Sequence, residues 1–162
     1  MALKQKTAAE VIVDIVQQEG VEYIFGLPGG AAIPIFDALV DSSVELILTR
    51  HEQGAAHMAD GYARASGKPA VVLVTSGPGA TNTITGILTA QMDSVPMVII
   101  CGQQTTFNLG LDAFQEADVS GISFPVVKHS YLIKDAKDTA RVLREAFFLS
   151  QTGRPGPVLV DV

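Results

Sequence analysis

The sequence is poor in aromatic residues and in cysteine. Aromatic residues make up 6% of its 162 residues and tryptophan is absent, so aliphatic side chains and alanine must build the core, as in folds that pack helices on a sheet. Cys101 is the single cysteine, which excludes an internal disulfide and is typical of a reducing compartment. We expect it to be a small buried hydrophobic residue.

The sequence also lacks basic clusters and long apolar runs. Its net charge is −6 and no run of Lys or Arg occurs, which argues against nucleic acid as a partner. No apolar run approaches the length of a membrane-spanning helix, and residues 1–6 lack the apolar stretch of a signal peptide. These features predict a cytoplasmic protein with no membrane segment.

Apolar runs of strand length alternate with helical patterns along the chain. The strand runs are nearly continuous in Val, Ile and Leu, which is typical of a parallel sheet covered on both faces. We predict an α/β fold in a single domain, residues 1–162, with three layers (helix, parallel sheet, helix) and about six parallel strands. Strands are expected at 21–25, 44–48, 70–74, 97–101, 129–133 and 157–162, and helices at 7–20, 31–40, 52–66, 80–92 and 136–150.

Polar turn motifs follow several of these strands. They are Gly-Leu-Pro-Gly-Gly at 26–30, His-Glu-Gln at 51–53, Ser-Gly-Pro-Gly at 76–79 and Gly-Gln-Gln at 102–104. Ligands bind beyond the carboxyl ends of the strands in such sheets, so the motifs predict one ligand site at that edge. None of them matches a known phosphate-binding loop.

Glu52 stands where an apolar strand gives way to a helix of small residues. Burial there favours the protonated form of a carboxyl group, so Glu52 is predicted to hold or share a proton near neutrality. The alternative is an ordinary glutamate that stabilises the start of a helix. A metal site of His51, Glu52 and His57 is not expected, because the two histidines are six residues apart and face different ways.

The segments at 49–65 (Thr-Arg-His-Glu-Gln-Gly-Ala-Ala-His and onward) and 75–82 (Thr-Ser-Gly-Pro-Gly-Ala-Thr-Asn) resemble the pyrimidine-binding domain of thiamine-diphosphate (ThDP) enzymes. The resemblance is greatest to the acetolactate synthase large-subunit family and runs from residue 7 to residue 162. It implies the ThDP-binding fold and the condensation of two pyruvates, or of pyruvate and 2-oxobutyrate, with decarboxylation in valine and isoleucine biosynthesis. It also implies ThDP, Mg²⁺ and FAD as cofactors, a homodimer with the ThDP site between subunits, and a small regulatory subunit.

The resemblance also implies roles for individual residues. Glu52 activates the cofactor, and Gln115 approaches the reacting centre. One segment departs from the family pattern, because Gln-Thr-Thr-Phe-Asn at 104–108 replaces a Val-Pro sequence with basic residues, so the family's channel mouth is not carried over. The implied cofactor contacts are Pro28, Gly29, Glu52, Pro78 and Asn82, with Ser94 near a flavin, and the implied substrate-channel residues are Phe114 and Lys128.

The family's diphosphate and Mg²⁺ are held by a later domain with a Gly-Asp-Gly…Asn motif, and no Gly-Asp-Gly occurs in this sequence. We therefore expect the central and diphosphate-binding domains to lie outside this chain, and the chain alone to be inactive. Two alternatives stay open. One is a separate pyrimidine-domain subunit of another ThDP-dependent keto-acid decarboxylase, and the other is a non-catalytic binding domain.

Overall fold

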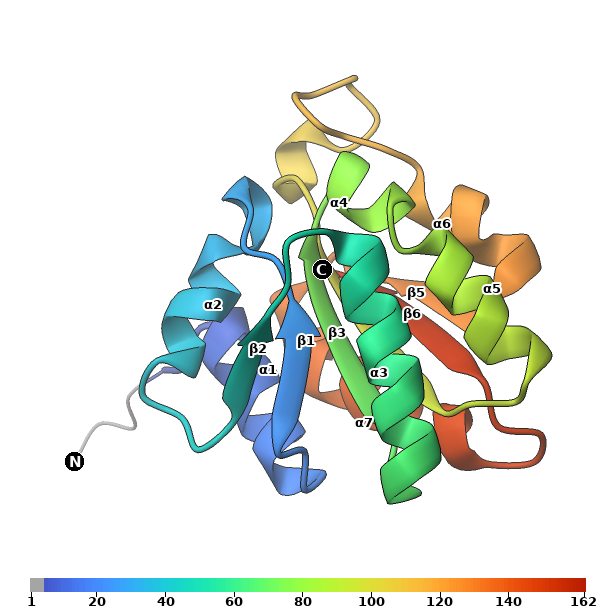
Figure 1. Ribbon diagram of the computed structural model, residues 1–162. Coiled ribbons are helices and arrows are strands. Elements are labelled where there is room, and N and C mark those ends of the chain that lie inside the picture. Colours follow the sequence, from blue (N-terminus) through green and yellow to red (C-terminus); the bar gives the residue numbers. More distant parts are fainter. Residues whose placement is uncertain (1–4) are drawn as a thin grey trace.

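Six parallel strands form one sheet in the order β2-β1-β3-β4-β6-β5 (Figure 1). The structure is a computed structural model that describes residues 5–162. The prediction that residues 1–6 contain no signal peptide therefore falls largely outside the described residues. The predicted α/β class with about six parallel strands is confirmed. The strands are β1 (Tyr23–Gly26), β2 (Glu45–Leu48), β3 (Ala70–Thr75), β4 (Met97–Gly102), β5 (His129–Leu132) and β6 (Pro157–Asp161).

Helices cover both faces of this sheet and give the predicted three layers. α1 (Ala8–Gln18), α2 (Ile33–Leu39) and α7 (Thr139–Gln151) lie on one face, and α3 (Glu52–Ser66) and α5 (Ile84–Met92) lie on the other. The short helices are α4 (Pro78–Thr81) and α6 (Val119–Ser123), with 3-10 turns η1 (Gly30–Ala32), η2 (Thr106–Asn108), η3 (Phe124–Val126) and η4 (Ala136–Asp138).

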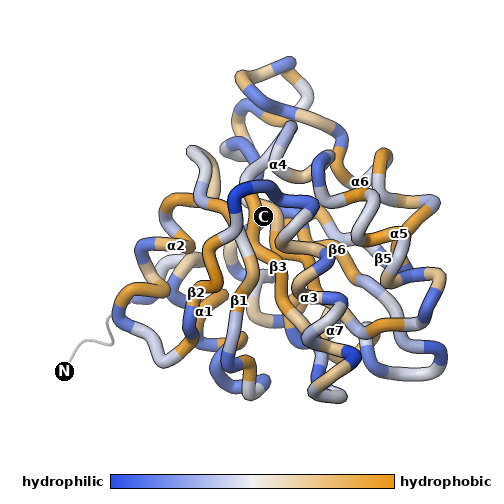
Figure 2. Tube along the Cα trace, in the orientation of Figure 1, coloured by the Kyte–Doolittle hydropathy of each residue, from blue (hydrophilic) through white to orange (hydrophobic). Residues whose placement is uncertain are grey.

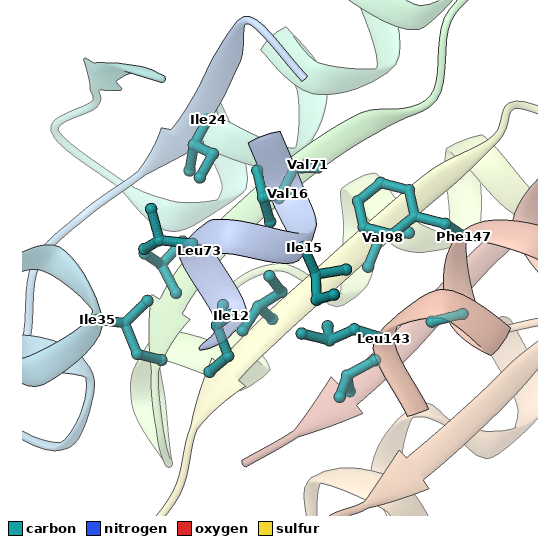
Figure 3. Close-up of a cluster of buried hydrophobic side chains, with 14 of the residues drawn as sticks. Ile12, Ile15, Val16, Ile24, Ile35, Val71, Leu73, Val98, Leu143 and Phe147 are labelled. Atoms are coloured by element: carbon teal, nitrogen blue, oxygen red, sulfur yellow. The ribbon is translucent and has the colours of Figure 1, made fainter. Parts of the chain in front are cut away.

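The inner strands β3, β4 and β6 are buried at every position and are mostly apolar, whereas the edge strands β2 and β5 have exposed residues. In β3, Val71 and Leu73 join the core beneath α1 and α7, whereas Val72 and Val74 join the core beneath α3 and α5. Figure 3 shows the first of these cores, into which Phe147 of α7 projects. Each fully buried aliphatic side chain stabilises the fold by about 1.5–3 kcal/mol.

The first helix begins as its sequence predicts. Thr7 Oγ1 accepts a hydrogen bond from the Glu10 backbone N–H at 3.2 Å, and the Glu10 carboxylate accepts one from the Thr7 N–H at 2.7 Å. This capping box satisfies two backbone donors at the start of α1. Gly20, with a φ of 74°, follows the helix in the left-handed conformation that glycine favours.

The single helix predicted over 80–92 is wrong, because the structure divides it into α4 and α5. The Thr83 N–H and the Thr83 hydroxyl both donate to the Ala80 carbonyl, at 3.0 and 2.6 Å. A continuous α-helix would offer that carbonyl to Ile84 instead. The chain therefore tightens at residues 82–83, and this bend orients Asn82.

The carboxyl ends of the strands meet at one edge of the sheet, at the top of Figure 1. The turns after β1, β2 and β3 and the long loop after β4 all lie there. Figure 2 shows a hydrophilic stretch between β2 and α3, in contrast to the hydrophobic strands below it. The hydrophilic residues between β2 and α3 thus lie at the carboxyl edge, as the motif there predicts.

Candidate active site

Glu52 is the first residue of α3 and lies at the carboxyl edge of the sheet. The preceding His51 is extended and caps the helix, with its Nδ1 accepting from the Gln53 N–H at 3.1 Å. Thr49 ties this turn to the end of β1, because its N–H and its hydroxyl both donate to the Gly26 carbonyl. The turn is therefore fixed at both ends, and Glu52 is half-buried rather than fully shielded from solvent.

Asn82 contacts Glu52 directly. The side-chain N–H of Asn82 donates to Glu52 Oε2 at 2.9 Å, although the two residues lie 30 positions apart in sequence. The bond passes across the end of β1, because Glu52 follows β2 and Asn82 follows β3. It fixes Oε2 of Glu52, whereas Oε1 accepts no hydrogen bond from residues 5–162 and lies beside Gly79.

Two glycines pack against Thr75 at the end of β3. A Cβ atom on Gly29 would lie 2.5 Å from Thr75 Cγ2, and one on Gly79 would lie 2.7 Å from the same atom. A Cβ on Gly79 would also lie 3.6 Å from Glu52 Oε1. The turns that carry Pro28 and Pro78 therefore converge on Thr75, and both prolines are exposed there.

The loop after β4 folds over the turn at 76–79. Gly77 has a φ of 54° and a ψ of −117°, and a Cβ atom on it would collide with the Gln115 carbonyl oxygen. Gln115 itself is exposed with a φ of 58°, and the neighbouring Phe114 is 82% exposed. The structure thus brings Gln115 and Phe114 to the same edge as Glu52.

Ser94 and Lys128 lie at the opposite edge, because they precede β4 and β5. Ser94 Oγ accepts from Arg154 Nε at 2.8 Å, and its φ is 60°. Lys128 Nζ donates to the carbonyls of Leu149 and Thr152 at the end of α7. The structure does not bring these two residues together with Glu52, and their flavin and channel roles stay predictions.

Asp161 is a buried carboxyl group that the sequence did not single out. It ends β6 at the carboxyl edge, is 2% exposed, and accepts at Oδ2 from Gln103 Nε2 at 3.0 Å. Burial raises the pKa of Asp161 to about 6, and the hydrogen bond from Gln103 opposes this only in part. One feature of the sequence could have identified this residue, because Asp161 is the acidic residue at the end of an otherwise apolar predicted strand.

The groups gathered around Glu52 form a small polar site. Among residues 5–162, no group of three His, Cys, Asp or Glu side chains is arranged to hold a metal. Within the same residues, no helix is long and apolar enough to cross a membrane. The residues that the site offers are one half-buried carboxylate, an amide that orients it, and bare glycine backbone.

Comparison with known proteins gives a family for this arrangement. The family model described as thiamine pyrophosphate enzyme, N-terminal TPP binding domain, matches residues 6–122 (thiamine pyrophosphate, TPP, is ThDP). The acetolactate synthase large subunit of Haemophilus influenzae is 59% identical over 161 residues, which are 99% of this chain and 28% of that protein. The acetolactate synthase isozyme 3 large subunit of Escherichia coli is 55% identical over 161 residues, again 99% of this chain and 28% of that protein.

A third relative, the acetolactate synthase of Mycobacterium bovis, is 50% identical over 163 residues, covering all of this chain and 26% of that protein. The chain thus spans between a quarter and a third of the length of these relatives. The family match covers both the turn with Glu52 and the turn with Asn82. With more than half of its residues matched, the chain belongs to the thiamine pyrophosphate enzyme family, as an N-terminal TPP binding domain.

Proposed function

We propose that this chain binds the pyrimidine end of ThDP, as the first domain of an acetolactate synthase large subunit. The contact between Asn82 and Glu52 is the observation that carries the proposal, because it orients one carboxylate at the edge where ligands of such sheets bind. The identity of 59% to an acetolactate synthase large subunit supports the choice of enzyme.

The residues present fit a polar ligand. The turns with Gly29 and Gly79 pack tightly on Thr75, because a Cβ on either glycine would lie within 2.7 Å of Thr75 Cγ2, and this packing holds Gly79 beside Glu52 Oε1. The hydroxyls of Thr75 and Ser76 are buried and have no hydrogen-bond partner within the described chain. Buried polar groups normally have partners, so these unpaired hydroxyls at the end of β3 favour a site at which a polar ligand completes their bonding.

Glu52 is the proposed catalytic residue. Its Oε2 is held by Asn82, and its Oε1 would hold or share a proton with a nitrogen of the pyrimidine ring. When bound, ThDP supplies the electron sink that allows a 2-keto acid to lose CO₂. In this proposal Asn82 orients Glu52 through their hydrogen bond. This role adds to the cofactor contact that the sequence predicts for Asn82.

The substrates, pyruvate and 2-oxobutyrate, would approach from the loop that carries Phe114 and Gln115. In this proposal a domain outside the chain holds the diphosphate and Mg²⁺, and FAD lies near Ser94. A second copy covers the carboxyl edge in a homodimer, for which the half-buried Glu52 and the exposed Phe114 leave an open surface. A small regulatory subunit and a cytoplasmic location complete the proposal.

The test is the Glu52→Gln variant of the complete protein, in which this chain is joined to the other domains found in its relatives. Glutamine keeps the shape of the side chain but holds no transferable proton. We expect acetolactate formation from pyruvate to fall by about 10²- to 10⁴-fold while the melting temperature is retained. Glu45→Gln, at an exposed carboxylate of β2, is the matched control and should leave activity unchanged.

Product analysis separates the proposal from the alternatives. Release of aldehyde in place of acetolactate would identify another keto-acid decarboxylase. A Glu52→Gln enzyme within a few-fold of the wild-type rate would return Glu52 to the role of an ordinary helix-start carboxylate.

A further inference from the structure

The loop between β4 and α6 carries Gln115 in a conformation that needs support. Gln115 has a φ of 58° and Asp112, in the same loop, has a φ of 54°. Such backbone conformations are unfavourable for residues with a Cβ atom and persist only when surrounding contacts hold them. The contacts that hold Gln115 are therefore informative about its function.

The first contact comes from Gln104. Its side-chain N–H donates to the carbonyl of Phe114 at 2.7 Å, immediately before Gln115. The bond therefore holds the backbone at the residue that precedes Gln115.

The second contact comes from Gln103, whose side chain reaches the backbone of Ala117, two residues beyond Gln115. Gln103 Nε2 donates to the Ala117 carbonyl at 3.1 Å and to Asp161 Oδ2 at 3.0 Å, and Gln103 Oε1 accepts from the Gln104 N–H at 2.9 Å. The ionised carboxylate of Asp161 can only accept a hydrogen bond, and the backbone N–H of Gln104 can only donate one. The side-chain amide of Gln103 therefore makes all three bonds in one of its two flipped orientations only.

The third contact is steric. The Gln115 carbonyl occupies the space in which a side chain on Gly77 would lie. Gln115 is thus supported from below by the turn at 76–79 and on both sides by side-chain amides. The same turn leads into Asn82, which holds Glu52.

We propose that Gln103 and Gln104 form an amide clamp, positioning residues that hold the backbone on both sides of Gln115 and so aim its side chain at the reacting centre. The clamp is a property of the fold, whereas its effect on turnover rests on the proposed function. Gln103 is anchored to the sheet through Asp161, and Gln104 extends the hold to Phe114. Gln104 is the better test position, because replacing Gln103 would also strip Asp161 of its partner.

The clamp itself is tested by hydrogen exchange on the 162-residue chain with Gln104→Val. Losing one neutral hydrogen bond should speed exchange at the Ala113 and Glu116 amides by about 2- to 10-fold. Gln151→Val is the matched control, because Gln151 Nε2 also donates to a backbone carbonyl, that of Phe147, at 3.0 Å and far from the loop. Unchanged exchange in the Gln104 variant, or equal acceleration in the control, would overturn the clamp.

The effect on catalysis is tested by a double-mutant cycle in the complete protein. Gln104→Val should lower kcat by about 2- to 10-fold and should have no further effect once Gln115→Ala is present. Two independent, multiplying effects would overturn the positioning role. If Gln115→Ala alone leaves kcat at the wild-type value, the role proposed for Gln115 has failed, and the exchange result still decides the clamp.

Discussion

The buried carboxyl group of Asp161 makes the stability of this chain depend on pH in a way that Asp161→Asn should abolish. The Asp161 side chain is 2% exposed, and only one of its oxygens has a hydrogen-bond partner within the described residues. Burial is the main cause that raises its pKa from 3.8 to about 6. A tenfold change in proton affinity corresponds to about 1.4 kcal/mol, so the ionised form costs about 3 kcal/mol of folding free energy.

The sign follows from proton binding. Below pH 4 the carboxyl group is protonated in both the folded and the unfolded chain. Between about pH 4 and pH 6 the folded chain keeps a proton that the unfolded chain has lost, so stability falls as the pH rises through this window. Above pH 6 both forms are ionised, and the loss stays constant.

The assay is urea unfolding of the 162-residue chain and its Asp161→Asn variant at pH 4 and at pH 7.5. The difference in unfolding free energy between the two proteins should grow by about 2–3 kcal/mol from the lower to the higher pH. A constant offset from the new amide is the same at both pH values and drops out of this comparison.

Asp41→Asn, at an exposed carboxylate, is the control and should change stability by less than about 0.5 kcal/mol at either pH. A variant of Asp161 whose stability runs parallel to the wild type from pH 4 to pH 7.5 would refute the reasoning from burial.

Other predictions concern the site and its turns. Asn82→Ala should lower the activity of the complete protein by about 10-fold or more, since a hydrogen bond to a charged group is lost. Asn82→Asp should lower the activity further, because it places a second carboxylate beside Glu52. Steady-state rates of acetolactate formation check both variants. Gly77→Ala should destabilise the chain by about 1–3 kcal/mol in urea unfolding, whereas Gly61→Ala, in an open position of α3, should stabilise it by up to about 1 kcal/mol. Burial raises the pKa of the Cys101 thiol, so this cysteine should react with a thiol reagent only after unfolding; rapid labelling of the folded chain would contradict this.

The fold was predictable because its signals are local. Strand runs such as 70–74 are apolar at each position, and the capping box of Thr7 and Glu10 predicts the start of the first helix. The bend at Thr83 was missed because a threonine hydroxyl that donates to a carbonyl three residues earlier leaves no periodicity signal.

The site was predictable only in part. Glu52 and Asn82 could each be named from their motifs, but their contact depends on the strand order β2-β1-β3, which hydrophobic patterns do not specify. The positions of Ser94 and Lys128 at the amino edge follow from their places before strands. The contacts of Gln103 and Gln104 are long-range bonds from side chains to backbone, and no spacing in the sequence encodes them.

The bond from Asn82 to Glu52 also has a consequence for folding. Glu52 follows β2 and Asn82 follows β3, and β1 lies between these two strands in the sheet, so the pair forms once β2, β1 and β3 have docked in register. A partly folded species in which β3 is detached holds the carboxylate without its amide. A ligand that needs both groups therefore binds only the fully folded chain, and by mass action it stabilises that chain against every partly folded form.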